Sequence, residues 1–135
     1  KIYHIPGHTT GHIAFHFFKE KKIFTGDTLF SLGCGRIFEG TYEQMFSSLN
    51  KIKKLPKDTE IYCGHEYTLQ NGNFCLANDT ANFKLKEKIE KVKEKLKKKL
   101  PSIPTILADE IECNIFLKAK DLKSFSKLRD LKDNF

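Results

Sequence analysis

Three short segments of this chain each place one possible metal ligand beside a glycine, at the end of an apolar, strand-like run. They are Pro6-Gly7-His8-Thr9, Thr25-Gly26-Asp27-Thr28 and Cys63-Gly64-His65-Glu66. Glycine lets the chain turn sharply at a strand end and lets backbone approach whatever the neighbouring side chain holds. If the three ends meet at one edge of a sheet, two imidazoles and one carboxylate gather there, a set that suits a divalent metal ion. The set is incomplete, because a two-metal centre needs about twice as many ligands.

The length and composition of the chain are enough for one hydrophobic core, or for a small layered unit with a helical appendage. It has 135 residues, of which 39% are apolar, and a formal net charge of +7. Nucleic acid, a membrane surface or an anionic small molecule could attract this charge, but the excess is concentrated between Lys84 and Lys99. We interpret that stretch as a solvated helix face with a buried stripe. No apolar run approaches the roughly 18–20 residues of a membrane span, so we expect neither nucleic acid nor membrane as a partner.

The four cysteines are Cys34, Cys63, Cys75 and Cys113. They show no C-x-x-C spacing and no dense framework, which favours reduced thiols and a cytoplasmic location. The first residues, Lys1 to Ile5, indicate a strand rather than a signal peptide. An organellar form stays open, because its targeting signal would lie in a preceding segment.

Four short runs rich in β-branched and aromatic residues predict strands. They are Ile2–Ile5, His12–Phe18, Lys22–Thr25 and Glu60–Cys63. Between the last two, Thr41 and Gln44 form the pattern of a capping box, and the helix that follows ends before Pro56. Strands with ligand-bearing ends and a helix between them predict an α/β sheet with an active site at one edge.

The pattern changes after Tyr67. Apolar residues recur at steps of three and four from Phe83 to Leu96, which predicts an amphipathic helix, and Pro101 stops it. No strand pattern is visible from Thr105 to Phe135, so we expect a second, mostly helical part there. The predicted division is a sheet-bearing domain over residues 1–76 and a helical domain over residues 77–135.

Four longer segments carry a more specific signal: PGHTTGH at 6–12, FTGDTLF at 24–30, GCGRIFEGT at 33–41 and YCGHEYT at 62–68. In this order and spacing they closely resemble glyoxalase II, the hydroxyacylglutathione hydrolases of the metallo-β-lactamase superfamily. The resemblance continues through Asn114–Leu117 and Arg129–Phe135, so it covers nearly the whole chain. The first two segments alone indicate only the superfamily, whereas the others, together with the terminal R-x-x-K, are specific to this branch.

The resemblance implies a fold, namely the C-terminal half of a metallo-β-lactamase-type αβ/βα sandwich followed by a small, mostly α-helical substrate-binding domain. The family's T-H-x-H-x-D-H cluster, which supplies four metal ligands, would precede Lys1. Half a sandwich exposes an apolar sheet face and unpaired strand edges. We therefore expect the missing N-terminal half, or self-association, to cover that face.

By resemblance, His8 binds the first of two divalent metal ions, His65 binds the second, and Asp27 bridges them and is catalytic. The ligand set suits zinc and also accepts iron or manganese. Taken singly, a histidine beside a glycine is more often a turn residue, and Asp27 could simply cap a turn, so it is the joint order that favours ligands. His12 is predicted to form a supporting hydrogen bond rather than to bind metal.

Arg36, Tyr67, Arg129 and Lys132 match positions that resemble the family's glutathione contacts. Glutathione carries two carboxylates, for which guanidinium and ammonium groups are apt. Arg129 and Lys132 stand three residues apart on a predicted helix, so they could reach one carboxylate together. The alternative for them is a solvated cationic tail. Phe38 stands where many members have tyrosine, which removes a hydroxyl group from the substrate site.

The resemblance implies an enzyme of the glyoxalase system, which serves methylglyoxal detoxification. It would hydrolyse the thioester S-D-lactoylglutathione to glutathione and D-lactate, with a hydroxide that bridges the two metal ions as the nucleophile. Two alternatives stay open. The chain as it stands could be a truncated, metal-deficient and inactive fragment, or it could come from another enzyme of the superfamily, such as a persulfide dioxygenase.

Overall fold

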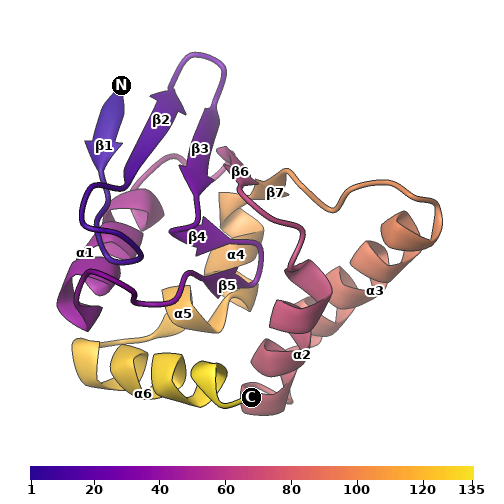
Figure 1. Cartoon of the computed structure of the whole chain (residues 1–135). Helices are drawn as coiled ribbons and strands as arrows, with labels where there is room; N and C mark the ends of the chain where they lie inside the picture. The colour runs from indigo at the N-terminus through magenta and orange to yellow at the C-terminus, as the bar shows by residue number, and fades with distance from the viewer.

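Five strands form one mixed sheet in the order β1-β2-β3-β6-β7 (Figure 1). The computed structural model describes residues 1–135. The strands are β1 (Ile2–His4), β2 (Ile13–Phe17), β3 (Lys22–Gly26), β6 (Glu60–Cys63) and β7 (Thr105–Ile106). The β3 and β6 strands are parallel, whereas the other neighbours are antiparallel. Because parallel strands end on the same side of a sheet, β3 and β6 deliver their last residues, Gly26 and Cys63, as direct partners at one edge.

One face of the sheet is packed and the other is not. In β2, Ala14 and His16 are buried while Phe15 and Phe17 are exposed, as the period of two in a strand requires. Helix α1 (Tyr42–Lys53) contributes Met45, Leu49 and Ile52 to the buried core. It begins at Thr41 with the predicted capping box, so that prediction is confirmed.

The opposite face of the sheet carries a row of apolar side chains. Ile13, Phe15, Phe17 and Phe24 each keep between 40% and 50% of their surface exposed. Their rings associate across the strands, since Phe24 lies 5.8 Å from Phe17 and stacks 4.9 Å from Tyr62. We call this set of five residues the open face.

A second, two-stranded unit lies beyond the end of β3. It consists of β4 (Leu29–Phe30) and β5 (Gly33–Cys34), joined by a turn at Ser31 and Leu32. Leu32 adopts a φ of +60°, a left-handed conformation that is uncommon for a non-glycine residue. Both strands are buried, so the hairpin sits inside the molecule between the sheet and the helices (Figure 1).

Five helices make up most of the rest of the chain. They are α2 (Thr68–Asn78), α3 (Phe83–Lys97), α4 (Leu107–Cys113), α5 (Ile115–Lys118) and α6 (Leu122–Asp133). Helix α3 buries Leu85, Ile89 and Val92 and exposes most of its lysines, which confirms the predicted amphipathic pattern. One cluster of buried side chains runs from Ile23 in the sheet to Phe116 in α5, so the two parts share a core. No helix is both long enough and apolar enough to cross a membrane.

The predicted α/β class with a mostly helical C-terminal part is confirmed, and the four predicted strands are present within two residues of their expected bounds. The prediction of no strand after Thr105 was wrong, because Thr105 pairs with Ile61 to form β7. Two residues are too few to show an alternating pattern. The β4–β5 hairpin and α2 were also not predicted. The predicted domain boundary after residue 76 falls within α2 and stays a prediction.

Candidate metal and substrate site

His8, Asp27 and His65 lie together at the edge of the sheet where β3 and β6 end. His8 Nε2 is 3.6 Å from one carboxylate oxygen of Asp27, and His65 Nε2 is 3.3 Å from the other. Asp27 follows Gly26 directly, and His65 stands two residues beyond Cys63, so the parallel pairing of β3 with β6 brings them together. The structure thus gathers the three side chains that the sequence singled out, from segments 19 to 57 residues apart.

His8 is held in its place by the loop that follows β5. Its Nδ1 lies 2.8 Å from the carbonyl oxygen of Arg36. A carbonyl oxygen only accepts hydrogen bonds, so Nδ1 carries a proton, and Nε2 is the ring nitrogen that faces Asp27. The His8 carbonyl in turn accepts the backbone N–H groups of Phe38 and Glu39 at 3.3 and 3.2 Å. These bonds fix both the ring and the backbone of His8.

His12 supports the site through a hydrogen bond to the backbone of Asp27. Its Nε2 accepts the backbone N–H of Asp27 at 3.2 Å, and its Nδ1 is 3.5 Å from the hydroxyl of Thr9. The prediction that His12 forms a supporting hydrogen bond is therefore confirmed. This bond orients the peptide that carries Asp27.

Gly64 illustrates why the site needs glycines. A Cβ atom at that position would lie 2.4 Å from Oδ1 of Asp27, well inside van der Waals contact. Any larger residue would push the Asp27 carboxylate away from His65. The glycine therefore permits close approach of backbone to carboxylate, as the sequence pattern indicated.

The distances around Asp27 suit metal coordination better than direct hydrogen bonding. Nitrogen and oxygen ligands about 2.0–2.1 Å from a tetrahedral metal ion are about 3.4 Å from each other, close to the 3.3 and 3.6 Å seen here. Because the two imidazoles face different oxygens, they form two separate nitrogen–oxygen pairs that share Asp27. No group of three or more His, Cys, Asp or Glu side chains in this chain is arranged to hold one ion by itself. Within this chain, each of the two nitrogen–oxygen pairs that share Asp27 is therefore too small a ligand set to form a complete metal site.

Two of the four predicted substrate residues lie beside this cluster with exposed side chains. The Tyr67 ring stacks on the His65 ring at 4.7 Å, with an angle of 12° between their planes. The Arg36 guanidinium lies over the Phe38 ring at 5.4 Å and 3.7 Å from a carboxylate oxygen of Asp133. Both side chains are therefore exposed to solvent close to the cluster.

Arg129, on α6, is placed differently, since only 2% of it is exposed. Its Nη1 donates to the carbonyls of Cys34 and Gly35 at 2.6 and 3.2 Å, and its Nη2 donates to Asp133 at 3.0 Å. Its Nε has no partner. Arg129 therefore binds the segment that leads into Arg36, and Asp133 lies between the two guanidinium groups.

Lys132 lies one turn from Arg129, with its Nζ 5.9 Å from the centre of the Phe74 ring. Burial, followed by the nearby Arg129 charge, lowers the pKa of Lys132. Burial likewise raises the pKa of the Cys34 thiol, against the opposing effect of Arg129. A common carboxylate partner for Arg129 and Lys132 stays a prediction. Asp133 was not among the predicted site residues, although its spacing of four from Arg129 on one helix is a usual spacing of an ion pair.

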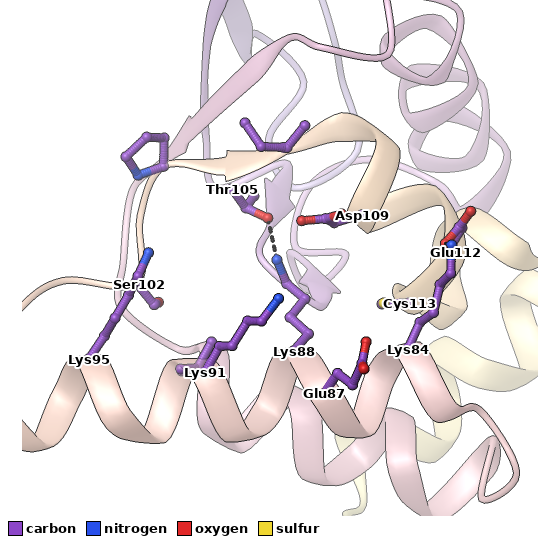
Figure 2. A pocket seen from close by; sticks show the side chains of 13 residues that line it. Lys84, Glu87, Lys88, Lys91, Lys95, Ser102, Thr105, Asp109, Glu112 and Cys113 are labelled. Carbon is purple, nitrogen blue, oxygen red and sulfur yellow. Dashed lines mark hydrogen bonds and ion pairs between the residues drawn. The ribbon is translucent and has the colours of Figure 1, made fainter.

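One hollow of the surface adjoins the His8–Asp27–His65 cluster, and another lies away from it. One, of about 500 Å³, is lined by Cys63–Glu66 and by Leu96, Lys99, Leu100, Pro101 and Ile103, so His65 forms part of its wall. The other, of about 360 Å³, lies between α3 and the β7–α4 segment; its lining includes four lysines of α3 and the acids Glu87, Asp109 and Glu112 (Figure 2). None of the seven predicted site residues lines this second hollow.

Comparisons with known proteins agree on the two parts of the chain. Residues 66–135 match the family model described as hydroxyacylglutathione hydrolase C-terminus, and residues 1–65 match the metallo-β-lactamase superfamily. A hydroxyacylglutathione hydrolase of Pelagibacter ubique (strain HTCC1062) is 64% identical over 135 residues, which are 100% of this chain and 56% of that protein. One of Prochlorococcus marinus (strain MIT 9301) is 52% identical over 98% of this chain and 54% of that protein. The chain thus spans about half the length of the curated relatives it matches.

Solved structures confirm the fold. The crystal structure of ETHE1 from Myxococcus xanthus matches 96% of this chain and 44% of that chain, with a TM-score of 0.65 and 24% identity. A metallo-β-lactamase from Staphylococcus aureus matches 98% of this chain and 38% of that chain, with a TM-score of 0.60 and 22% identity. At these identities the likeness concerns the fold alone.

Proposed function

The chain belongs to the hydroxyacylglutathione hydrolase family of the metallo-β-lactamase superfamily, and on this premise we propose that the whole protein hydrolyses S-D-lactoylglutathione to glutathione and D-lactate. The observation that carries the proposal is the placement of His8 and His65 against the two separate oxygens of Asp27. The family match over residues 66–135 favours this thioesterase over other enzymes of the superfamily.

We propose that Asp27 is the shared ligand of two divalent metal ions, with His8 as a ligand of the first and His65 of the second. The metal is zinc, iron or manganese, because imidazole and carboxylate suit all three. When bound, such a pair of ions supplies an acidified water molecule and polarises the thioester carbonyl. In support, the protonated Nδ1 of His8 leaves its Nε2 free to bind metal, and each nitrogen–oxygen distance is close to the edge of a coordination tetrahedron.

The chain's own residues would keep this geometry fixed during turnover. Arg36 holds the His8 ring through its backbone carbonyl, and His12 holds the peptide of Asp27. The stacked Tyr67 ring limits rotation of the His65 imidazole. Each proposed ligand therefore has at least one supporting contact, which is the arrangement that preserves ligand orientation at metal sites.

We propose that Arg36, Tyr67, Arg129 and Lys132 bind the glutathione part of the substrate. The exposed Arg36 guanidinium is available to a carboxylate directly. Arg129 is already bonded to Asp133, so a substrate carboxylate that reaches Arg129 would take the place of the Asp133 carboxylate. Phe38 offers its ring rather than a hydroxyl group, so it contributes contact area and no hydrogen bond.

We propose that the remainder of the metallo-β-lactamase domain covers the open face. The row of half-exposed phenylalanines is too apolar for a surface that stays in water. All four cysteines are free thiols, which fits a cytoplasmic location. For the 135-residue chain by itself we propose that it is inactive, since each half of the metal centre here has only one imidazole besides Asp27.

The test is hydrolysis of S-D-lactoylglutathione, followed by loss of the thioester absorbance. The full-length protein is compared with the separate 135-residue chain, both freed of metal and then reloaded with zinc. We expect turnover by the full-length protein alone. A full-length protein that loads zinc and leaves the thioester intact would contradict the proposed activity, and turnover by the purified fragment would contradict its proposed inactivity.

A further inference from the structure

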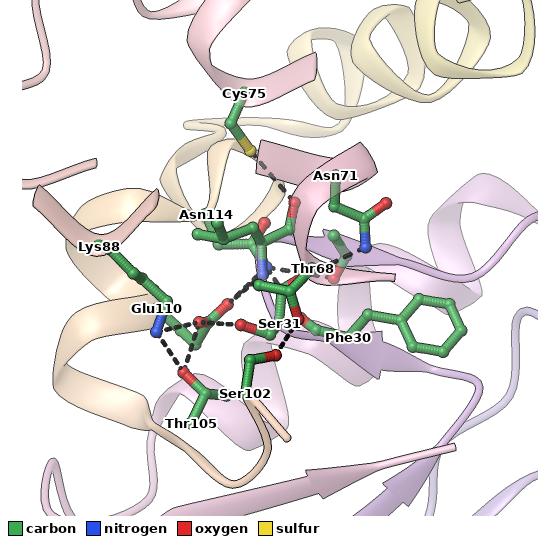
Figure 3. A network of polar contacts seen from close by, with 12 residues as sticks. Phe30, Ser31, Thr68, Asn71, Cys75, Lys88, Ser102, Thr105, Glu110 and Asn114 are labelled. Atoms are coloured by element: carbon green, nitrogen blue, oxygen red, sulfur yellow. Dashed lines mark hydrogen bonds and ion pairs between the residues drawn. The ribbon is translucent and has the colours of Figure 1, made fainter. Parts of the chain in front are cut away.

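The carboxylate of Glu110, on α4, is completely buried and bound on all sides (Figure 3). Its Oε1 accepts the backbone N–H of Leu32 at 2.7 Å and the amide of Asn114 at 3.1 Å. Its Oε2 accepts the hydroxyls of Thr105 at 2.7 Å and Ser31 at 3.2 Å, and the ammonium group of Lys88 lies 3.3 Å away. A buried carboxylate is tolerated only with such partners, because desolvation of an unpaired charge is very costly.

Two of these partners, Ser31 and Leu32, form the turn of the β4–β5 hairpin, almost 80 residues earlier in the chain. The helices hold the rest of that turn in the same way. All four carbonyls from Phe30 to Gly33 accept a side-chain hydrogen bond from a helix or cap residue (Figure 3). The donors are Asn114 to Phe30 and Gly33, Asn71 to Ser31, and Cys75 to Leu32.

The turn needs this support because of its backbone. Leu32 sits at a φ of +60°, a conformation that persists for a leucine only when its surroundings enforce it. The charged acceptor Glu110 binds the N–H of that same residue, and hydrogen bonds to charged groups are stronger than neutral ones. Glu110 thus holds both residues of the turn, Ser31 and Leu32, through hydrogen bonds.

The hairpin and the two residues that follow it, Gly35 and Arg36, contact the three candidate metal ligands. Its first strand ends at Phe30, whose ring packs 6.1 Å from the His65 ring. Its second strand runs into Gly35, where an added Cβ would lie 1.9 Å from the carbonyl oxygen of Asp27. The next residue, Arg36, provides the carbonyl that fixes His8. A shift of the turn therefore moves a contact of every ligand.

We propose that Glu110 is a positioning residue of the metal site, acting through the β4–β5 hairpin. The inference rests on the proposed function, since what is positioned is the His8–Asp27–His65 cluster. The helical part would then have a second task besides substrate binding. Through Glu110, it would fix the geometry of metal ligands that Glu110 itself does not contact.

A matched pair of variants separates this role from general stabilisation. Ser31→Ala and Thr105→Val each remove one hydroxyl donor to the same oxygen of Glu110, but only Ser31 belongs to the hairpin. The Thr105 bond is the shorter of the two, and Thr105 also accepts a bond from Lys88 at 2.6 Å. If the network served stability alone, Thr105→Val would therefore have a larger effect than Ser31→Ala on every measured quantity.

Glu110→Gln is the more severe variant. The N–H donors of Leu32 and Asn114 require the glutamine oxygen on their side, so the glutamine NH₂ group must face the Lys88 ammonium. This conflict weakens the whole network. Glu112→Gln is its control, because Glu112 lies on the same helix in a surface ion pair with Lys84.

The readouts are taken on zinc-loaded full-length protein well below the unfolding temperature of each variant. They are the rate of zinc loss to a chelator and, in metal-free protein, the NMR signal and solvent exchange of the His8 Nδ1–H. We expect Glu110→Gln to speed zinc loss about tenfold, which corresponds to the lower end of the loss in metal affinity for residues that orient ligands. We expect Ser31→Ala to speed zinc loss and His8 proton exchange, and Thr105→Val and Glu112→Gln to change neither.

Equal zinc loss for Ser31→Ala and Thr105→Val, or a Thr105→Val effect that is the larger, would overturn the proposal. So would a Glu110→Gln protein that folds and holds zinc as wild type does. If Glu110→Gln fails to fold, the Ser31 and Thr105 pair decides. Failure of the proposed activity is recognised separately. In that case wild-type protein would leave the thioester intact, but the exchange measurement on His8 would still distinguish the variants.

Discussion

The ring Nδ1–H of His8 donates to the backbone carbonyl of Arg36 across 2.8 Å, so one hydrogen bond joins a proposed metal ligand to a proposed substrate residue. The bond uses the backbone of Arg36 and leaves its guanidinium exposed to solvent. The two tasks of Arg36 can therefore be separated by mutation, because a new side chain keeps the carbonyl in place.

Arg36→Gln is expected to weaken substrate binding while leaving the metal site intact. Loss of one charge-assisted hydrogen bond at an exposed position costs about 1–2 kcal/mol, which raises KM about tenfold. The value of kcat and the zinc content should stay near those of wild type. Steady-state kinetics with lactoylglutathione measure the first two, with Lys91→Gln as a control for the loss of a surface charge. A fall in kcat at constant KM would contradict a binding role.

Asp133→Asn tests whether the substrate displaces an internal carboxylate. Asp133 lies 3.0 Å from Arg129 Nη2 and 3.7 Å from Arg36 Nε, so it occupies the space between the two guanidinium groups. Its neutralisation leaves the buried Arg129 charge without an anionic partner, and we expect the free energy of unfolding to fall by about 2 kcal/mol. We expect KM to fall as well, because a competing anion has been removed. Urea unfolding and kinetics provide the two values, and a raised KM would show that Asp133 assists binding.

The alkaline limit of stability is expected to depend on buried thiols. Burial raises the pKa of Cys75 to about 12 and that of Cys113 to about 11. The unfolded thiols ionise near pH 8.5, so above that pH the unfolded state binds fewer protons than the folded state and the free energy of unfolding falls as pH rises. This contribution to stability is complete below about pH 8.5 and is lost toward the folded pKa values.

The Cys75 thiol accounts for about 2 kcal/mol of this loss between pH 8.5 and 10. Urea unfolding at several pH values should therefore show a shallower alkaline decline for Cys75→Ala than for wild type. The comparison concerns the slope, because the substitution also removes packing at every pH. Parallel declines would show that Cys75 does not ionise on unfolding in this range.

Much of the fold could be predicted from sequence, because β2, β3 and β6 show clear alternation and Thr41 shows a capping box. The convergence of His8, Asp27 and His65 was predictable from the glycine beside each at a strand end. The burial of Arg129 could not be predicted, because the local sequence around a buried cation in a lysine-rich segment looks the same as that around a solvated cation. Glu110 was equally hidden, because its neighbours Asp109 and Glu112 are acidic too and only the packing of α4 selects which one is buried.

The open face predicts the behaviour of the separate 135-residue chain. Phe17 and Phe24 are half-exposed and in contact with each other, so two copies can bury this surface by association. Sedimentation should show self-association, and Phe17→Lys with Phe24→Lys should restore a monomer. Phe83→Lys is the control, because Phe83 is more exposed than either but lies on α3. A monomeric wild-type chain, or equal dissociation by the control, would contradict a role for the open face.

The most direct test of the account is the metal content of full-length protein with and without the Asp27 carboxylate, measured by elemental analysis after removal of loosely bound ions. Wild type should retain about two metal ions per chain. Asp27→Ala should retain fewer and should no longer hydrolyse lactoylglutathione, since both ions lose the same ligand. An Asp27→Ala protein that keeps the wild-type metal content and thioesterase activity would contradict the bridging role from which the rest follows.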